Sequence, residues 1–559
     1  NIQMDATRYA EGWKVGVAGA NRNYKARLTA TYASGLLENG WAFVGQLAYR
    51  YSPAIGKNII GAGSDYNSFG YFFSAEKRWS STHKLSILTF GSPTERGQSA
   101  AVTQEAVNLI GSINYNPYWG FQNGKVRNSR IVKSYDPTII ASYEYKITDN
   151  QRLKVGLGLH HSFYSNSALT FFNAPDPRPD YYRNMPSFLW DGQLKADANG
   201  EIGFITEDLN GKPVGVGGQY GGQYYGGTID EQQFKKLTDL WTSGDPKTTQ
   251  IDFDALYSAN YANNAINPEG SARYMIERRH NDIAEAAASA LYTNTETNNL
   301  RIIAGLELKE SSGIHYKTVD DLLGGNQWID IDPFADRDIK ELATNLGMTQ
   351  QDIENVRQND LANRNATVKT NDKFGYDYSI NMFNAKLWAQ NEWTWNEVDL
   401  YYGLQVALSQ FERTTRMLNG RAWYLSTINP SHAYYYLGTQ YKQIQNGEYA
   451  KSYKGYSHFF VDPSFKLGAT YKIDGHNKLK VNALMQTAAP LARDAYVAPR
   501  VHDRATDNIY RHDRAKNLLD VYAASEKRIS YDLTYEFNYP IIRGRITAFQ
   551  THFWDGSEL

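Results

Sequence analysis

The feature that most constrains this chain is the alternation of apolar and polar residues in short segments that recur along most of its length. In residues 24–32, Tyr24, Leu28 and Tyr32 fall on one face of an extended chain, and alanines occupy the positions between them. Lysine, arginine and threonine fill the intervening positions. Side chains of a β-strand point alternately to opposite faces. The pattern therefore predicts strands with one apolar and one polar face.

Short polar turns join these segments into hairpins. The first hairpin turns at Asn39-Gly40, a dipeptide that favours tight hairpin turns. The same form predicts turns at residues 80–83, 148–151, 294–299, 396–397, 474–477 and 540–544. Together with a strand over residues 13–19, the hairpins predict about 15 antiparallel strands.

Much longer segments separate the hairpins, at residues 52–68, 91–137, 162–282, 311–378, 413–462 and 488–527. Short turns at one end and long loops at the other are typical of a transmembrane β-barrel in the outer membrane of a Gram-negative cell. The fold class is therefore predicted to be all-β. Within loop 311–378, the spacing of Ile339, Leu342 and Leu346 predicts a small helical insert, with a second turn over Gln350–Val356.

Composition is compatible with such a barrel and excludes other classes. Of the 559 residues, 42% are hydrophobic and 14% aromatic, and no apolar run approaches the length of a membrane-spanning helix. The absence of cysteine excludes disulfides and thiolate metal sites. A net charge of -1 argues against binding to nucleic acid.

The chain also resembles a known family, the TonB-dependent receptors of the outer membrane, and within it the branch of SusC-like and related large transporters. The resemblance lies in Asn-Gly-Trp-Ala-Phe at 39–43, Phe-Gly-Ser-Pro-Thr-Glu-Arg-Gly at 90–97 and Gly-Arg-Ile-Thr-Ala-Phe at 544–549. It lies further in residues 115–130, which include Asn-Pro-Tyr-Trp-Gly, and in residues 315–325. The Asn-Pro-Tyr-Trp-Gly segment is the more specific part.

The resemblance implies energised import of a nutrient. Such receptors have a barrel of about 22 strands closed by a plug, and the TonB-ExbB-ExbD complex acts on a segment that precedes the plug. Residues 1–559 are accordingly expected to form part of a barrel, without the plug. Outer-membrane lipid and a surface lipoprotein of the SusD type are the other implied partners. A glycan, peptide, siderophore or cobalamin each remains open as the ligand.

Two other functions stay open at this stage. An outer-membrane barrel protease or lipase would bring catalytic side chains together near one rim. A structural or adhesive barrel would not transport at all. No catalytic spacing stands out in the sequence, although folding can assemble a triad from distant residues.

Aromatic residues in the long loops are the candidate ligand contacts, because their faces stack on sugars and on apolar ligand surfaces. For each residue, packing between loops is the competing interpretation. His160 and His161, at a predicted strand end, are interpreted as structural, and the Gly/Tyr-rich tract 215–227 as an exposed loop tip. The candidate ligand residues are Trp119, Trp190, Trp241, Trp328, Tyr434 and Tyr435.

Clustered aspartates suggest one candidate metal site. Asp330, Asp332 and Asp336 lie close together in the sequence, and carboxylates are ligands that Ca²⁺ prefers. The spacing is not that of an EF-hand. A solvated acidic loop that caps the following helix is the competing interpretation.

Overall fold

The structure, a computed structural model, places most of the chain. It describes residues 5–20, 24–53, 63–190, 194–196, 202–204, 219–220, 223–224, 231–297, 299–333, 335, 349–420, 453–454, 457–492, 496, 509–513, 518–522 and 524–556.

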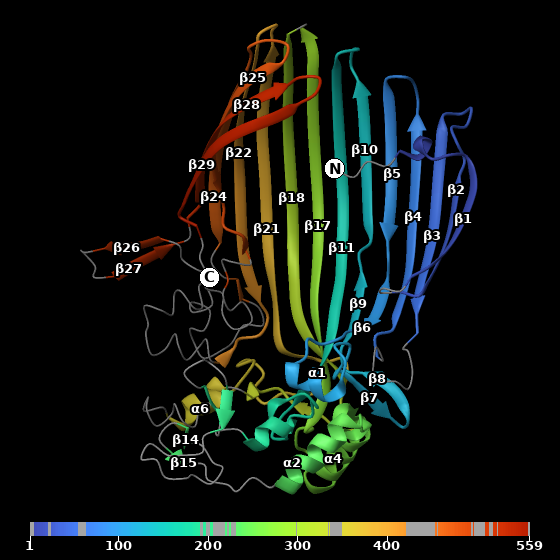
Figure 1. The fold of residues 1–559 in the computed structure, drawn as a ribbon, viewed down its shortest axis with the longest axis vertical. Helices are drawn as coiled ribbons and strands as arrows, with labels where there is room; N and C mark the ends of the chain where they lie inside the picture. Colours follow the sequence, from blue (N-terminus) through green and yellow to red (C-terminus); the bar gives the residue numbers. More distant parts are fainter. Residues whose placement is uncertain are drawn as a thin grey trace.

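Fifteen strands, each antiparallel to its neighbours, form one continuous wall (Figure 1). With the short strands β6 (Thr94–Gly97), β9 (Ile131–Tyr135) and β23 (Tyr453–Lys454), they make a sheet of 18 strands. The predicted all-β antiparallel architecture and the predicted strands are confirmed. In order across the wall the fifteen are β1 (Gly12–Gly19), β2 (Ala26–Ala33), β3 (Trp41–Ser52), β4 (Tyr66–Arg78), β5 (His83–Gly91), β10 (Thr138–Lys146), β11 (Gln151–Phe171), β17 (Tyr274–Thr297), β18 (Leu300–Asp321), β21 (Lys373–Thr394), β22 (Val398–Thr415), β24 (His458–Lys472), β25 (Asn477–Ala488), β28 (Glu526–Asn538) and β29 (Arg543–Trp554).

The two ends of the wall differ as the sequence predicts. The short turns lie together at the upper end in Figure 1, and the α-helices and long connections gather at the lower end. At the two sides of the wall, β1 pairs only with β2 and β29 only with β28, as far as the chain is described. A complete barrel of about 22 strands remains a prediction.

The central strands are far longer than a membrane requires. β11, β17, β18 and β21 contain 21, 24, 22 and 22 residues, whereas a tilted strand crosses a bilayer in about 9–11. The wall therefore projects beyond the membrane on the loop side. The predicted loop boundaries at residues 162, 282, 311 and 378 are corrected accordingly, because β11 continues to Phe171 and β18 to Asp321, while β17 begins at Tyr274 and β21 at Lys373.

The wall has an apolar face and a polar face. On the apolar face, one row of paired residues crosses six strands as Ala141, Leu157, Ala288, Leu308, Ala385 and Leu408. The next row toward the short turns lies on the opposite face and contains Ser142, Gly156, Ser289, Glu307, Lys386 and Ala407. Leu157 is 57% exposed and Leu387 is 63% exposed. We call the apolar face outward and the polar face inward, because lipid is the medium that accepts such a band.

Aromatic side chains border the apolar band at both ends. On the turn side, the rings of Trp13 and Tyr32 lie 5.0 Å apart and those of Trp41 and Phe43 are stacked. On the loop side, the Tyr71 and Tyr135 hydroxyls are 2.9 Å apart and the Tyr135 ring stacks on Phe163. Two aromatic belts flanking an apolar band are the interfacial girdles of a transmembrane barrel.

The loop-side connections contain small cores of their own. In one, Phe253 and Leu256 of α4 (Phe253–Ile266) pack with Ile276 of β17. In another, Trp328 and Val368 pack with Met275, the residue before Ile276. Because neighbouring residues of a strand point to opposite faces, the tips of the central strands are covered on both sides.

Several helices in the connections were not predicted, namely α1 (Gln104–Ile110), α2 (Glu231–Thr242), α3 (Pro246–Thr249) and α4. The predicted turn over Gln350–Val356 is confirmed as α6, which begins with a capping box between Thr349 and Asp352. Residues 338–348, the first part of the predicted insert, lie outside the described residues. No helix in the described part of the chain is long and apolar enough to cross a membrane.

Candidate functional site

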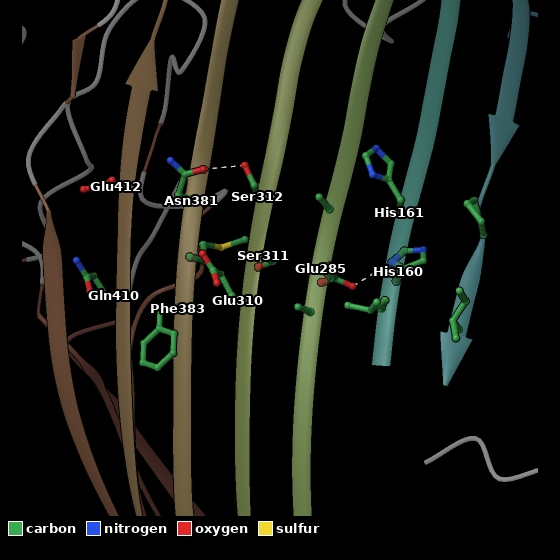
Figure 2. A pocket seen from close by; sticks show the side chains of 16 residues that line it. His160, His161, Glu285, Glu310, Ser311, Ser312, Asn381, Phe383, Gln410 and Glu412 are labelled. Carbon is green, nitrogen blue, oxygen red and sulfur yellow. Dashed lines mark hydrogen bonds and ion pairs between the residues drawn. The ribbon is translucent and has the colours of Figure 1, made fainter. Parts of the chain in front are cut away.

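The inward face carries ionised groups held in place by one another. Glu285 of β17 lies between His160 and Lys309, with Oε2 at 3.1 Å from Nδ1 of His160 and Oε1 at 2.5 Å from Nζ of Lys309. The three side chains come from neighbouring strands β11, β17 and β18. The predicted strand end at His160 and His161 is wrong, because both residues lie within β11. The contact of His160 with Glu285 joins β11 to β17 (Figure 2), which agrees with a structural role for this histidine.

The start of the described chain is fastened to the inward face near the turn side. Ala6 is fully buried against Ala33, Ala42 and Val44. Asp5 accepts a hydrogen bond from Nζ of Lys84 at 3.2 Å. A segment of chain therefore enters on the polar side of the wall before β1 begins.

A charged cluster lies on the inward face of the projecting wall. Glu277 is buried and pairs with Arg279 at 2.5 Å and Lys317 at 2.9 Å. Arg130 lies beside them with its guanidinium 5.2 Å from the Tyr118 ring centre. Burial lowers the pKa of Arg130, and the nearby Arg279 lowers it further. Three cations around one carboxylate give this region a positive excess, which suits the binding of anionic groups.

The Asn-Pro-Tyr-Trp-Gly segment holds the loop layer together. The Tyr115 hydroxyl donates to the Thr249 carbonyl at 2.5 Å, and Asn116 donates to the Gln98 carbonyl at 3.1 Å. Gly120 lies in β7 (Trp119–Gln122), directly beside the parallel strand β16 (Ile251–Asp252). A β-carbon on Gly120 would lie 1.7 Å from the Ile251 carbonyl oxygen. This close approach requires glycine.

Three of the six candidate ligand residues are buried in the loop layer. Trp119 is 1% exposed, Trp241 0% and Trp328 2%. The Trp241 ring meets Tyr115 edge to face at 5.8 Å, and Trp328 packs in the core beside β17. Their rings contact the chain itself, so a ligand role for them stays a prediction. The side chain of Trp190, together with Tyr434 and Tyr435, lies outside the described residues, as does most of the tract 215–227.

The two described aspartates of the candidate calcium site, Asp330 and Asp332, are held by different partners. Asp330 is buried and accepts hydrogen bonds from Asn359 at 2.7 Å and from the Gly375 amide at 3.0 Å. Asp332 instead accepts from the Ala335 amide at 3.1 Å. Asp336 lies outside the described residues. No group of three metal-binding side chains occurs among the residues that the structure places, and the calcium site stays a prediction.

The sequence did not predict the carboxylates that organise the inward face, namely the buried Glu76 and Glu277 and the half-buried Glu285. Each of them lies within a strand and faces inward, where the alternation predicts a polar residue. Nothing in the spacing distinguishes them from exposed charges. Glu76 and Glu277 each have one partner two residues away in the same strand, Arg78 and Arg279. The other partners come from other strands or from the N-terminal segment.

The chain matches no family model and no curated protein. Among solved structures, it is similar to the ferric-catecholate import receptor Fiu from E. coli K12 in its open form, with 9% identity and a TM-score of 0.44, covering 95% of this chain and 58% of that one. It is similar to the ferric citrate transporter FecA in the unliganded form, with 6% identity and a TM-score of 0.47, covering 98% of this chain and 52% of that one. For the ferric yersiniabactin uptake receptor FyuA from Yersinia pestis, the identity is 8% and the TM-score 0.43, with 97% of this chain and 55% of that one covered. The chain thus spans less than two thirds of the length of these structures.

Proposed function

We propose that this chain forms most of the wall of an outer-membrane, TonB-dependent transporter that imports a nutrient into the periplasm. The observation that carries the proposal is the two-faced wall. Its outward face is an apolar band between two aromatic belts, and its inward face is lined by polar and charged side chains. A wall of this kind encloses a polar path through a membrane.

The loop side supports ligand capture from outside the cell. Strands of more than twenty residues carry the inward face well beyond the membrane, and the positive cluster around Glu277 lies in this projecting part. An anionic nutrient or chelate would meet Arg130 and Arg279 on entering. A surface lipoprotein of the SusD type would act at the same end.

The turn side supports coupling to the inner membrane. The segment Asp5–Thr7 is docked on the inward face near this end through Lys84 and Glu76. Asp5–Thr7 are thereby held on the enclosed side of the wall. A pull from the TonB complex on this segment would be transmitted to β4 and β5.

Uptake by the full-length protein in its native cell tests the proposal. The nutrient is first identified as the one whose radiolabelled uptake is lost when the gene is deleted. We expect this uptake to require an intact TonB system and to stop when the proton gradient is dissipated. Uptake that continues without TonB would overturn the proposal. Hydrolysis of the nutrient by the purified protein would favour the barrel enzyme, and surface adhesion without any uptake would favour the structural barrel.

A further inference from the structure

Two arginines lie directly opposite each other on the inward face of the wall. Arg27 of β2 is paired in register with Arg50 of β3. Arg50 has the same strand parity as Val44, against which the N-terminal segment packs, so both arginines face the enclosed side. The β-carbons of residues at such positions lie about 5 Å apart, and like charges there destabilise a sheet. The pair therefore requires an anion to offset its repulsion.

The surroundings of the pair do not supply this anion. Arg27 and Arg50 form no ion pair within the part of the chain that the structure places. The Nε–H group of Arg27 is shielded from solvent and has no acceptor among the described residues. A donor that loses water without gaining an acceptor is destabilising. A bound anion would satisfy this donor and the two charges together.

The sequence around the pair is strongly basic. Residues 12–64 run from the start of β1 to shortly before β4, and Glu38 is the single acidic residue in this stretch. Glu38 lies in the turn at the opposite end of the strands. On the other side of the pair, β4 contributes the uncharged Ser68 to the same row. The basic residues of the stretch are Lys14, Arg22, Lys25, Arg27, Arg50 and Lys57.

The pair lies at the loop-side mouth of the enclosed space. Tyr49 and Tyr51, which flank Arg50 along β3, point outward, and their rings are stacked. Tyr49 is in register with Phe69, which lies two residues before Tyr71 on the same face of β4. These tyrosines therefore belong to the loop-side aromatic belt. An anion that enters from outside the cell would meet the arginines at the depth of this belt.

The pair is separate from the positive cluster around Glu277. Between β3 and β17 lie β4, β5 with its continuation β6, β10 with its continuation β9, and β11. Five strand spacings correspond to about 24 Å along the wall. In the cluster, Glu277 already neutralises part of the charge of Arg279 and Lys317. The arginine pair retains both of its charges, so it is the better match for an anion with two negative charges.

The chemistry of the pair selects the class of anion. Each guanidinium group presents its N–H donors as a planar fork that fits two oxygens of an oxyanion. A carboxylate has two oxygens and one charge, and it would leave one arginine uncompensated. A phosphate monoester has three terminal oxygens and nearly two negative charges at neutral pH. Its oxygens and its charge match two facing arginines.

We propose that Arg27 and Arg50 bind the phosphate group of a small phosphorylated ligand at the mouth of the enclosed space. Both guanidinium groups donate to the phosphate oxygens, and the bound charge removes the repulsion between the arginines. The proposal deepens the import function and rests on it, because it names a phosphorylated nutrient as the ligand. Free phosphate would make the same contacts, and the test separates these two sources.

Thermal unfolding of the full-length protein tests the site. The midpoint is measured in chloride and in increasing glucose 6-phosphate at constant ionic strength, which excludes general screening as a cause. We expect glucose 6-phosphate to raise the midpoint, because a ligand that binds only the folded state stabilises it. Glucose should have no effect. A response to inorganic phosphate without any response to glucose 6-phosphate would overturn the assignment to a phosphorylated ligand.

Loss of one arginine should have opposite effects with and without the ligand. In chloride, Arg50→Gln should raise the midpoint, because the repulsion is removed. With glucose 6-phosphate, the same variant should need at least tenfold more ligand for an equal shift, because charged hydrogen bonds are lost. Arg27→Gln should behave in the same way. A midpoint lowered equally under both conditions would show that the arginines are structural, and would overturn the proposal.

A second pair of opposed cations provides the matched control. Lys146 of β10 lies in register with Arg152 of β11 on the same face, but Lys146 already pairs with Asp149 at 2.5 Å. Lys146→Gln combined with Arg152→Gln should therefore leave the response to glucose 6-phosphate unchanged. An equal loss of the response in this control would overturn the proposal. Nutrient uptake is measured in parallel, because a retained response without TonB-dependent uptake would count against the proposed import alone.

Discussion

Thr7 and Glu76 are joined across the inward face by three short contacts. The Thr7 amide donates to Oε2 of Glu76 at 3.2 Å, and the Thr7 hydroxyl lies 3.0 and 3.2 Å from the two carboxylate oxygens. Arg78 donates to Oε1 of the same carboxylate at 2.6 Å. Glu76 is fully buried. The Glu76 side chain of β4 therefore holds the segment before β1 in place. The same contacts stabilise its buried negative charge.

Removing this anchor should release the N-terminal segment. Glu76→Ala is expected to destabilise the docked segment by about 2–3 kcal/mol, because hydrogen bonds to a buried charged group are lost. Hydrogen exchange measured by mass spectrometry should show faster exchange at residues 5–8 while the amides of β4 stay protected. Unchanged exchange at residues 5–8 would contradict the anchoring role.

An exposed carboxylate on the outward face of the wall, in register with Asn67 of β4, provides the control. Glu95 of β6 pairs with Lys133 at 3.4 Å, and both side chains are about half exposed. Such pairs contribute less than about 1 kcal/mol. Glu95→Ala should therefore leave stability and exchange nearly unchanged.

Asp330 should make the loop layer sensitive to pH. Burial raises the pKa of this carboxyl to about 6, although Asn359 and the Gly375 amide donate to it. Since its folded-state pKa lies above the unfolded value, proton binding favours the folded loop. The stabilisation is fully present below about pH 4 and is lost as the pH rises through about 6.

The measurement is limited proteolysis of residues 329–375 as a function of pH, corrected for the pH profile of the protease on an unfolded substrate. Cleavage of the unaltered protein should increase between about pH 4 and 6, corresponding to roughly 2–3 kcal/mol. Asp330→Asn keeps an acceptor oxygen but cannot titrate, so its cleavage should not change over this range. A pH dependence that persists in Asp330→Asn would assign the effect to another group.

Gly120 should tolerate no larger residue. Gly120→Ala places a methyl group against the Ile251 carbonyl and should separate β7 from β16. We expect Trp119, which is now buried, to become accessible, and we expect fluorescence quenching by iodide to increase. Gly158→Ala is the matched control, because a β-carbon there meets nothing within 4 Å. Equal quenching in both variants would show that the close approach is not required.

The membrane-spanning part of the wall was predictable because its two environments impose strict alternation. Lipid selects Leu157 and Leu308 on one face, and the enclosed side selects Ser142 and Glu307 on the other. Beyond the membrane that selection ends. Glu310 and Ser312 break the apolar pattern, although β18 continues to Asp321. The strand predicted from alternation therefore ended at the limit of the apolar band, whereas the hydrogen-bonded strand β18 continues beyond it.

The inward network and the loop cores were not predictable, because they depend on contacts between distant positions. One partner of Glu76 lies at residue 7, and the Tyr115 hydroxyl donates to the carbonyl of residue 249. The alternation of apolar and polar residues within a strand does not reveal such pairs. The sequence also does not distinguish a tryptophan that packs between loops from one that contacts a ligand. Trp119, Trp241 and Trp328 were chosen as ligand contacts by residue type alone.

Trp241 offers a direct test of these two roles. Its ring is fully buried between Ala106, Tyr115 and Met185. If the ring is structural, Trp241→Ala leaves a cavity that costs about 3–5 kcal/mol, and the loop layer should become sensitive to protease. Tyr261→Ala, at a ring that is 59% exposed on α4, should leave protease sensitivity unchanged. Loss of nutrient uptake in Trp241→Ala with intact protease resistance would instead establish the ligand role, because only a ligand contact can be removed without loosening the loops.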